Sequence, residues 1–207
     1  MARVWLIRHA DTDYSFKKKY CGHNNPHLNK RGMVKAEMLG ERFKQITIDA
    51  VYSSDLRRTY ETADIIFKNM DIVEMRQLRE INFGIFAGLT YEDNLLQHPV
   101  LFQTWLKNFA AFKIPKGESL VDLEIRVQEA LNLIVESNRG KQVAMITHGG
   151  PIRVILSKAL GYGLKRFWDI GQENAALNVI DYSRKKNGEV IFMNDVSHLD
   201  SLNSNLK

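Results

Sequence analysis

The chain has 207 residues, of which 44% are hydrophobic and 26% are charged. This composition is typical of a globular protein and excludes a disordered or fibrous chain. The length suits a single domain over residues 1–207, or one domain with a modest insertion. The net charge of +5 favours anionic partners. The basic runs at 17–19 and 184–186 are short and lie outside any recognisable nucleic-acid module, so we expect solvated faces and no nucleic-acid partner.

Cys21 is the only cysteine, which excludes an intramolecular disulfide and a zinc site built from cysteines. The apolar run at the start is too short for a signal peptide, and no later stretch approaches the roughly 18 apolar residues of a membrane span. We therefore expect a cytoplasmic protein without a membrane partner.

Apolar runs of β-branched character alternate with segments of helical period, which predicts βαβ units and a mainly parallel sheet. An Asn-Gly pair between the last two predicted strands indicates a hairpin. The Ser-Ser-Asp triplet at 53–55 is expected to cap the helix that follows it. In chain order, strands are predicted from Val4 to the Arg8-His9 pair and over 50–52, 143–147, 175–182 and 189–194, and helices over 31–43, 56–67, 119 to about 139, and from 149 onward.

Residues from about 91 to 115 are rich in Leu, Phe and Trp but have mixed periodicity, which indicates a helical insertion that could form a lid. An aromatic stripe of this kind is more often core than a substrate contact. The polar tail at 200–207 is expected to fray.

Two predicted strands end in histidine, His9 and His148, and a third leads into a helix whose first turn holds Arg57 and Arg58. The carboxyl ends of parallel strands lie on one edge of a sheet, where ligands bind. The planar fork of Arg8 suits phosphate, and the helix start at residues 149–150 offers backbone donors. These residues therefore predict a site for a dianionic phosphate.

Transfer of a phosphoryl group to nitrogen needs an imidazole facing phosphorus and an acid that protonates the departing oxygen. Glu80 is the best candidate acid, because its apolar neighbours and nearby glycines would desolvate it and favour its protonated form. Taken separately, His9 could be a satisfied strand-end histidine beside a salt-bridged arginine, and Glu80 a surface ion pair.

In six segments taken together, the chain resembles the histidine phosphatase superfamily, also called the phosphoglycerate mutase-like family. The resemblance runs from about Val4 to Tyr182, nearly the whole chain. The matching segments are Arg8-His9-Ala10-Asp11-Thr12; Gly22 through Asn25-Pro26 and Leu28 to Gly32 and Ala36; Tyr52 to Arg58 with Thr62-Ala63; Leu78 to Tyr91; Gly117-Glu118-Ser119 with Arg126-Val127; and Thr147 to Arg153.

The resemblance implies a three-layer α/β/α sandwich with a mainly parallel sheet and the helical insertion over the active site. His9 would be the phosphorylated nucleophile, Arg8, Arg58 and His148 the phosphate pocket, and Glu80 the proton donor and later the base. The position in the motif selects Arg58, not Arg57. The family uses no metal, so no cofactor is expected, and the chain has no His-Glu-x-x-His pattern.

Three positions depart from the family pattern. Ala10 replaces the usual glycine, Asn25 stands where aspartate is usual, and Ser15 where an asparagine commonly assists phosphate binding. Ser15 and Asn25, together with Gly149 and Asn174, remain candidate substrate-binding residues.

Several further residues could border the cleft. His23 and His27 lie in a segment next to it, and Phe102, Trp105, Phe109 and Phe112 could line a substrate lid. Apolar residues of an edge strand, Val179 or Ile191, could support a homodimer.

The chain looks most like the alpha-ribazole phosphatases of cobalamin synthesis and the metal-independent phosphoserine phosphatases. A phosphomonoesterase acting on a small phosphorylated metabolite is therefore the leading hypothesis. A mutase of the phosphoglycerate type is the second, although the longer insertion and different Glu-bearing sequence usual in mutases are missing from this chain. The third hypothesis is a non-catalytic module that binds a phosphorylated ligand, but binding alone needs no acid.

Overall fold

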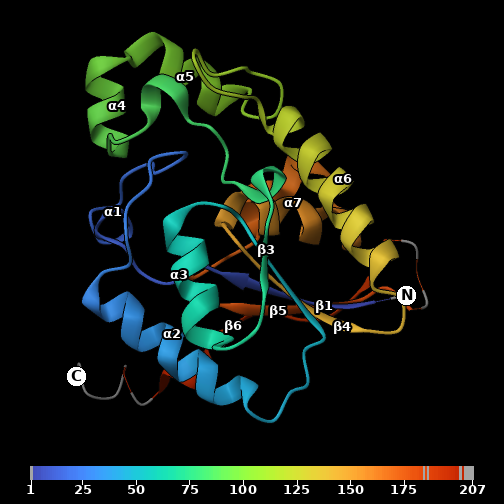
Figure 1. Ribbon diagram of the computed structural model, residues 1–207. Coiled ribbons are helices and arrows are strands. Elements are labelled where there is room, and N and C mark those ends of the chain that lie inside the picture. The colour runs from blue at the N-terminus through green and yellow to red at the C-terminus, as the bar shows by residue number, and fades with distance from the viewer. Residues whose placement is uncertain (1, 184, 186, 201, 203–207) are drawn as a thin grey trace.

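A six-stranded sheet with the order β3-β2-β4-β1-β5-β6 crosses the molecule (Figure 1). The computed structural model describes residues 2–183, 185, 187–200 and 202. The strands are β1 (Arg3–Arg8), β2 (Ala50–Ser53), β3 (Ile72–Glu74), β4 (Gln142–Thr147), β5 (Leu177–Asp181) and β6 (Glu189–Asp195). Strands β1 to β4 pair in parallel, whereas β5 runs antiparallel to both β1 and β6. The predicted mainly parallel sheet is confirmed.

Helices cover both faces of this sheet, with α2 and α3 on one side and α6 and α7 on the other (Figure 1). The predicted three-layer sandwich is therefore confirmed. The α-helices are α1 (Asp13–Phe16), α2 (Lys30–Phe43), α3 (Arg57–Ile66), α4 (Tyr91–Gln97), α5 (Pro99–Lys107), α6 (Leu120–Ser137) and α7 (Gly149–Ala159). Helices α4 and α5 form within the segment expected to be a helical insertion.

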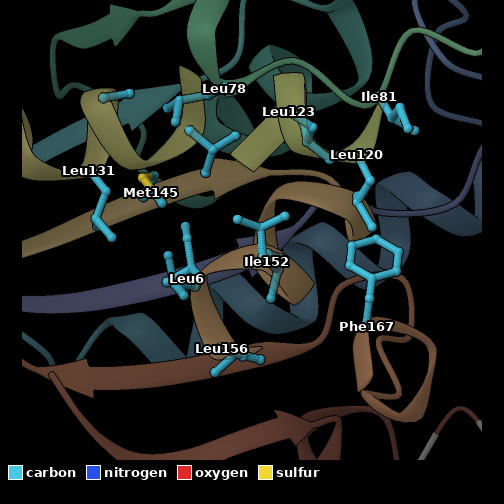
Figure 2. Close-up of a cluster of buried hydrophobic side chains, with 14 of the residues drawn as sticks. Leu6, Leu78, Ile81, Leu120, Leu123, Leu131, Met145, Ile152, Leu156 and Phe167 are labelled. Atoms are coloured by element: carbon cyan, nitrogen blue, oxygen red, sulfur yellow. The ribbon is translucent and has the colours of Figure 1, made fainter. Parts of the chain in front are cut away.

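Successive side chains of the central strands alternate between the two helical layers, as the two-residue period of a strand requires. Leu6 and Met145 face α6 and α7, where they pack with Ile152 and Leu156 in the larger core cluster (Figure 2). Ile7, next along β1, belongs instead to the cluster beneath α2 and α3. Because both faces are covered, the middle residues of β1 and β4 are apolar.

Helix α6 follows its sequence pattern closely. Ser119 caps it: the Ser119 hydroxyl accepts a hydrogen bond from the Asp122 N–H at 3.1 Å, and the Asp122 carboxylate accepts one from the Ser119 N–H at 3.0 Å. This reciprocal pair is a capping box. The predicted apolar stripe is buried at every position: Leu120, Leu123, Val127, Leu131 and Ile134.

The predicted cap of α3 is wrong. The N-cap residue is Leu56, which has no side chain able to cap, and the Arg57 N–H donates to Asn25 Oδ1 at 2.7 Å. Parallel pairing of β2 with β4 brings Ser54 beside His148, and the Ser54 hydroxyl bonds His148 Nε2 at 2.9 Å. The hydroxyl also accepts a longer hydrogen bond, at 3.4 Å, from the Leu56 N–H, but it caps no N–H within α3.

The hairpin between β5 and β6 is confirmed, although residues 184 and 186 of its connection lie outside the described residues. Val179 does not lie at an edge, because β5 is hydrogen-bonded on both sides and Val179 is 2% exposed. Ile191, on the edge strand β6, is 52% exposed. Most of the tail expected to fray, residues 201 and 203–207, also lies outside the described part. None of the helices in the described residues has the length and apolar character needed to span a bilayer.

The two glycines of α2 provide a matched test of the packing between this helix and the loop after β1. A Cβ at Gly32 would overlap the backbone oxygen of Asp11 and stand 2.9 Å from its nitrogen, whereas at Gly40 the nearest atom is 3.5 Å away. We expect Gly32→Ala to lower the free energy of unfolding by about 1–3 kcal/mol through overpacking. We expect Gly40→Ala to raise it by about 0.5–1 kcal/mol, since alanine favours a helix interior. Urea unfolding of both variants measures the difference, and equal effects would contradict it.

Candidate active site

Two buried histidines lie side by side where β1 and β4 end. Because Arg8 pairs with Thr147 across the parallel strands, the next residues, His9 and His148, leave the sheet at the same height. Their ring centroids are 5.2 Å apart, and the side chains are 5% and 0% exposed. The structure thus brings together the two histidines that the sequence placed at strand ends.

The His9 ring is held in one tautomer. Its Nδ1 lies 2.8 Å from the carbonyl oxygen of Ala10, so Nδ1 carries the proton and donates it. Nε2 then presents a lone pair, which accepts a hydrogen bond from Arg58 Nε at 3.2 Å. Burial, followed by the charges of Arg58 and Arg8, lowers the pKa of His9 well below its ordinary value. A neutral imidazole with an unprotonated Nε2 has the form that a nucleophile requires.

Arg58, not Arg57, is the arginine of α3 that reaches this histidine. Its side chain is 0% exposed and donates to the carbonyls of Gly22 at 2.8 Å and Asn24 at 2.7 Å. Arg57 is exposed and contacts the His27 ring at 2.9 Å. The choice that the motif predicts agrees with this geometry.

Arg8 contributes a second cation. One of its terminal nitrogens donates to the carbonyl of Gln172, while its buried Nε has no hydrogen-bond partner within the described structure. Burial lowers the pKa of Arg8 to about 10, which leaves it charged at neutral pH. Since buried donors in proteins are almost always paired, the free Nε indicates that a ligand oxygen completes this site.

His148 is the N-cap residue of α7. Its Nε2 bonds the Ser54 hydroxyl, whereas its buried Nδ1 has no partner among the residues described. Burial, and then the charges of Arg58 and His9, lower its pKa well below the ordinary histidine value. The ring is therefore neutral, and Nδ1 is a second buried polar atom available to a ligand.

Glu80 lies against the start of α7. Its Oε1 accepts hydrogen bonds from the N–H groups of Ile81 at 2.9 Å and Gly150 at 3.0 Å. The approach is close, because a Cβ at Gly150 would overlap this oxygen and displace the carboxylate. Within the described part of the chain Glu80 forms no ion pair. The alternative interpretation of the sequence, a surface ion pair at Glu80, therefore does not describe this residue.

Arg126 fixes the backbone of the Glu80 segment, a role that no pattern in the sequence indicates. Arg126 on α6 donates to the carbonyls of Gln77, Arg79 and Glu80 at 2.7, 2.7 and 2.9 Å, and pairs with Glu118 at 2.5 Å. Glu118 and Arg126 belong to a motif that is visible in the sequence, but their function as a clamp on the Glu80 segment is visible only in the structure.

The remaining predicted residues divide into those that reach the site and those that serve the local fold. Asn174 reaches it: Nδ2 donates to the His9 carbonyl at 3.0 Å, and the next residue, Ala175, has a left-handed backbone with φ of 63°. Ser15 borders a cleft of about 530 Å³ together with Arg8 and Asn174. Its hydroxyl, however, is engaged with the Thr12 backbone at 2.8 Å.

The other sequence candidates have structural partners. Asn25 caps α3, as described above. His23 Nε2 lies 3.0 Å from the Glu80 carbonyl, so it borders the site through a backbone contact, whereas His27 pairs with Glu61 at the surface. Ala10 is buried and has no positive φ, so the backbone there accepts a Cβ.

Taken together, the site places two buried guanidinium groups, two neutral imidazoles and the N-terminus of an α-helix around one point. In the described structure neither Arg8 nor Arg58 forms an ion pair with a carboxylate. Groups of three or more side chains placed to hold a metal ion are also missing from the described residues. Unpaired buried cations beside a helix N-terminus suit a small dianion such as phosphate.

Phosphate binding tests the assignment of the arginine in α3. We expect inorganic phosphate to raise the Tm of the wild type and to bind Arg58→Gln at least about ten-fold more weakly, because hydrogen bonds to charged groups contribute about 1.5–3 kcal/mol. Arg57→Gln, one residue away at the surface, should retain wild-type affinity. Thermal shift titration measures both, and equal weakening of the two variants would contradict the assignment.

The buried histidines make stability depend on pH. A histidine whose folded pKa is below its unfolded value of about 6.5 binds fewer protons when folded, so the free energy of unfolding falls as the pH drops below about 6.5. For one group the slope is at most about 1.4 kcal/mol per pH unit. Urea unfolding between pH 7.5 and 5 should therefore show a shallower decline for His148→Gln than for the wild type. Identical slopes would mean that His148 is not held neutral.

The chain is similar in sequence and in structure to several known proteins. "Phosphoserine phosphatase 1" of Hydrogenobacter thermophilus is 29% identical over 201 residues, covering 96% of this chain and 95% of the relative. "Phosphoglycerate mutase-like protein 4" of Arabidopsis thaliana is 32% identical over 204 residues, covering 96% of this chain and 87% of the relative. The solved structure of Bacillus stearothermophilus YhfR superposes with a TM-score of 0.89 at 25% identity, covering 97% of this chain and 100% of that one.

A family model described as "Histidine phosphatase superfamily (branch 1)" matches residues 4–196. This range contains every strand of the sheet from Val4 to the end of β6 and all the residues that surround His9. The chain belongs to branch 1 of the histidine phosphatase superfamily.

Proposed function

We propose that the protein is a phosphomonoesterase that hydrolyses a small phosphorylated metabolite through a phosphohistidine on His9. The observation that carries the proposal is the state of His9: a neutral ring whose Nδ1 is tied to the Ala10 carbonyl and whose Nε2 lone pair faces Arg58. Membership of the superfamily supports the proposal, as does the relative named a phosphoserine phosphatase.

In the first step, His9 Nε2 attacks phosphorus while the bond from phosphorus to the alcohol oxygen breaks. The electron pair of that bond stays on the oxygen, which takes a proton from the Glu80 carboxyl group and leaves as the free alcohol. Arg8, Arg58 and the free Nδ1 side of His148 surround the phosphoryl oxygens. Donors already fixed before charge develops lower the barrier without reorganisation.

In the second step, a water molecule attacks the phosphohistidine. Glu80, now a carboxylate, accepts a proton from the water as its oxygen bonds phosphorus and the N–P bond breaks. Inorganic phosphate leaves, and both His9 and Glu80 return to their starting states. The carboxyl group can serve both steps because the Ile81 and Gly150 N–H groups and the Arg126 clamp hold it in one place.

Release of inorganic phosphate from phosphoserine, alpha-ribazole phosphate, 3-phosphoglycerate and p-nitrophenyl phosphate in EDTA tests the proposal. We expect wild-type turnover of at least one ester, and a loss of at least about 10³-fold for His9→Ala. Glu80→Gln should lose about 10²–10⁴-fold with alkyl esters. With p-nitrophenyl phosphate the same variant should give a burst of nitrophenol followed by slow turnover, because nitrophenolate leaves without a proton but hydrolysis of the phosphohistidine still needs the base.

The rival functions give different results in the same assay. Activity that depends on priming with 2,3-bisphosphoglycerate, with phosphate returned to a bound substrate, would identify a mutase. Phosphate binding without turnover of any ester by a folded protein would identify a binding module. Full activity in His9→Ala would exclude a phosphohistidine on this residue.

A further inference from the structure

A small cavity lies next to Glu80, between α7 and the segment that contains α4 and α5. Its volume is about 40 Å³, room for about three water molecules. Glu80 lines it, and because Glu80 would protonate the departing oxygen, the cavity lies on the side of the leaving group. Five aromatic side chains and one cation form most of its wall: Phe83, Trp105, Phe109, Phe167, Trp168 and Arg153.

Arg153 is fixed in this wall by contacts on three sides. Its Nε donates to the Ile170 carbonyl at 2.8 Å. The centre of its guanidinium group lies 5.7 Å from the ring centroid of Phe167 and 5.7 Å from that of Trp168. These cation–π contacts leave the group little freedom to swing away from the cavity.

Arg153 forms no ion pair within the described structure. No carboxylate there lies within ion-pair distance, and the two terminal nitrogens make no hydrogen bond to a described residue. Burial lowers the pKa of Arg153, and the nearby charge of Glu80 opposes this shift.

Arg153 and Arg8 approach the start of α7 from the cavity and from the phosphate site. A Cβ at Gly149 would stand 3.1 Å from Arg153 Nη1 and 3.6 Å from Arg8 Nε. The two cations are therefore neighbours, but only Arg153 lines the cavity beside Glu80. A substrate with its phosphate at His9 and its ester oxygen at Glu80 would direct its next few atoms toward Arg153.

We propose that Arg153 binds a carboxylate group of the leaving alcohol and so selects short phosphorylated hydroxy acids or amino acids. This inference rests on the proposed phosphatase function and adds a specificity-determining residue to it. A planar guanidinium matches a carboxylate through two parallel hydrogen bonds. Since Arg153 and Glu80 line the same small cavity, a carboxylate within a few bonds of the ester oxygen can reach this guanidinium.

Two esters that differ only in the carboxylate test the inference: O-phosphoserine and O-phosphoethanolamine. Arg153→Gln should lower kcat/KM for phosphoserine by about 10–100-fold, the loss expected for a charged hydrogen-bonded pair, and change that for phosphoethanolamine by less than about three-fold. Arg153→Lys should restore part of the phosphoserine activity. Lys158→Gln, which removes a charge from the exposed end of the same helix, should alter neither ester.

Binding to His9→Ala separates failure of this inference from failure of the proposed function. Fluorescence of Trp105 and Trp168, which line the cavity, reports ligand binding without turnover. Phosphoserine should bind His9→Ala more tightly than phosphoethanolamine, and the added Arg153→Gln change should abolish the preference. Absence of that preference would overturn the inference even if esters are hydrolysed. Equal losses on both esters would also overturn it, because Arg153 would then serve the phosphate.

Discussion

The buried guanidinium of Arg58 is the interaction on which the rest of the site depends. It is charged and fully buried, yet its hydrogen bonds go to the carbonyl oxygens of Gly22 and Asn24 instead of a carboxylate. A carbonyl left unpaired in the interior costs about 1–3 kcal/mol. The conformation of the loop from 22 to 24 therefore depends on the position of the Arg58 side chain. The same side chain orients His9 through Nε2. One residue thus couples α3, the loop and the imidazole, and it retains a positive charge for an anion.

The sheet sets the position of everything around Arg58. Arg8 pairs with Thr147 and Ser53 with Ile146, so the chain leaves three adjacent parallel strands at nearly the same level. Side chains distant in sequence then meet without any long connection. The antiparallel β5 completes this edge, because the turn before it returns Asn174 to the His9 backbone.

Much of this arrangement could be predicted from the residues alone. Strand ends marked by His9 and His148 are visible because an apolar run stops at a polar residue, and the parallel order follows from alternating strands and helices. The roles of Arg126 and Arg153 could not be predicted, because they bind backbone carbonyls or aromatic faces, and these leave no pattern in the sequence. The cap expected from the Ser-Ser-Asp triplet is wrong because the Ser54 hydroxyl bonds His148 and the Asp55 carboxylate bonds Arg79, contacts that only the tertiary structure reveals.

The backbone conformation of Ala175 limits which residues position 175 can accept. A left-handed backbone costs a residue with a Cβ about 1–2 kcal/mol, and here it allows the Ala175 N–H to reach the carbonyls of Arg8 and His9 at 3.2 Å each. Glycine at this position would relieve the strain but would free the turn that carries Asn174. Position 175 therefore exchanges backbone strain in the folded state against conformational entropy in the unfolded chain, so its residue sets how firmly Asn174 is held.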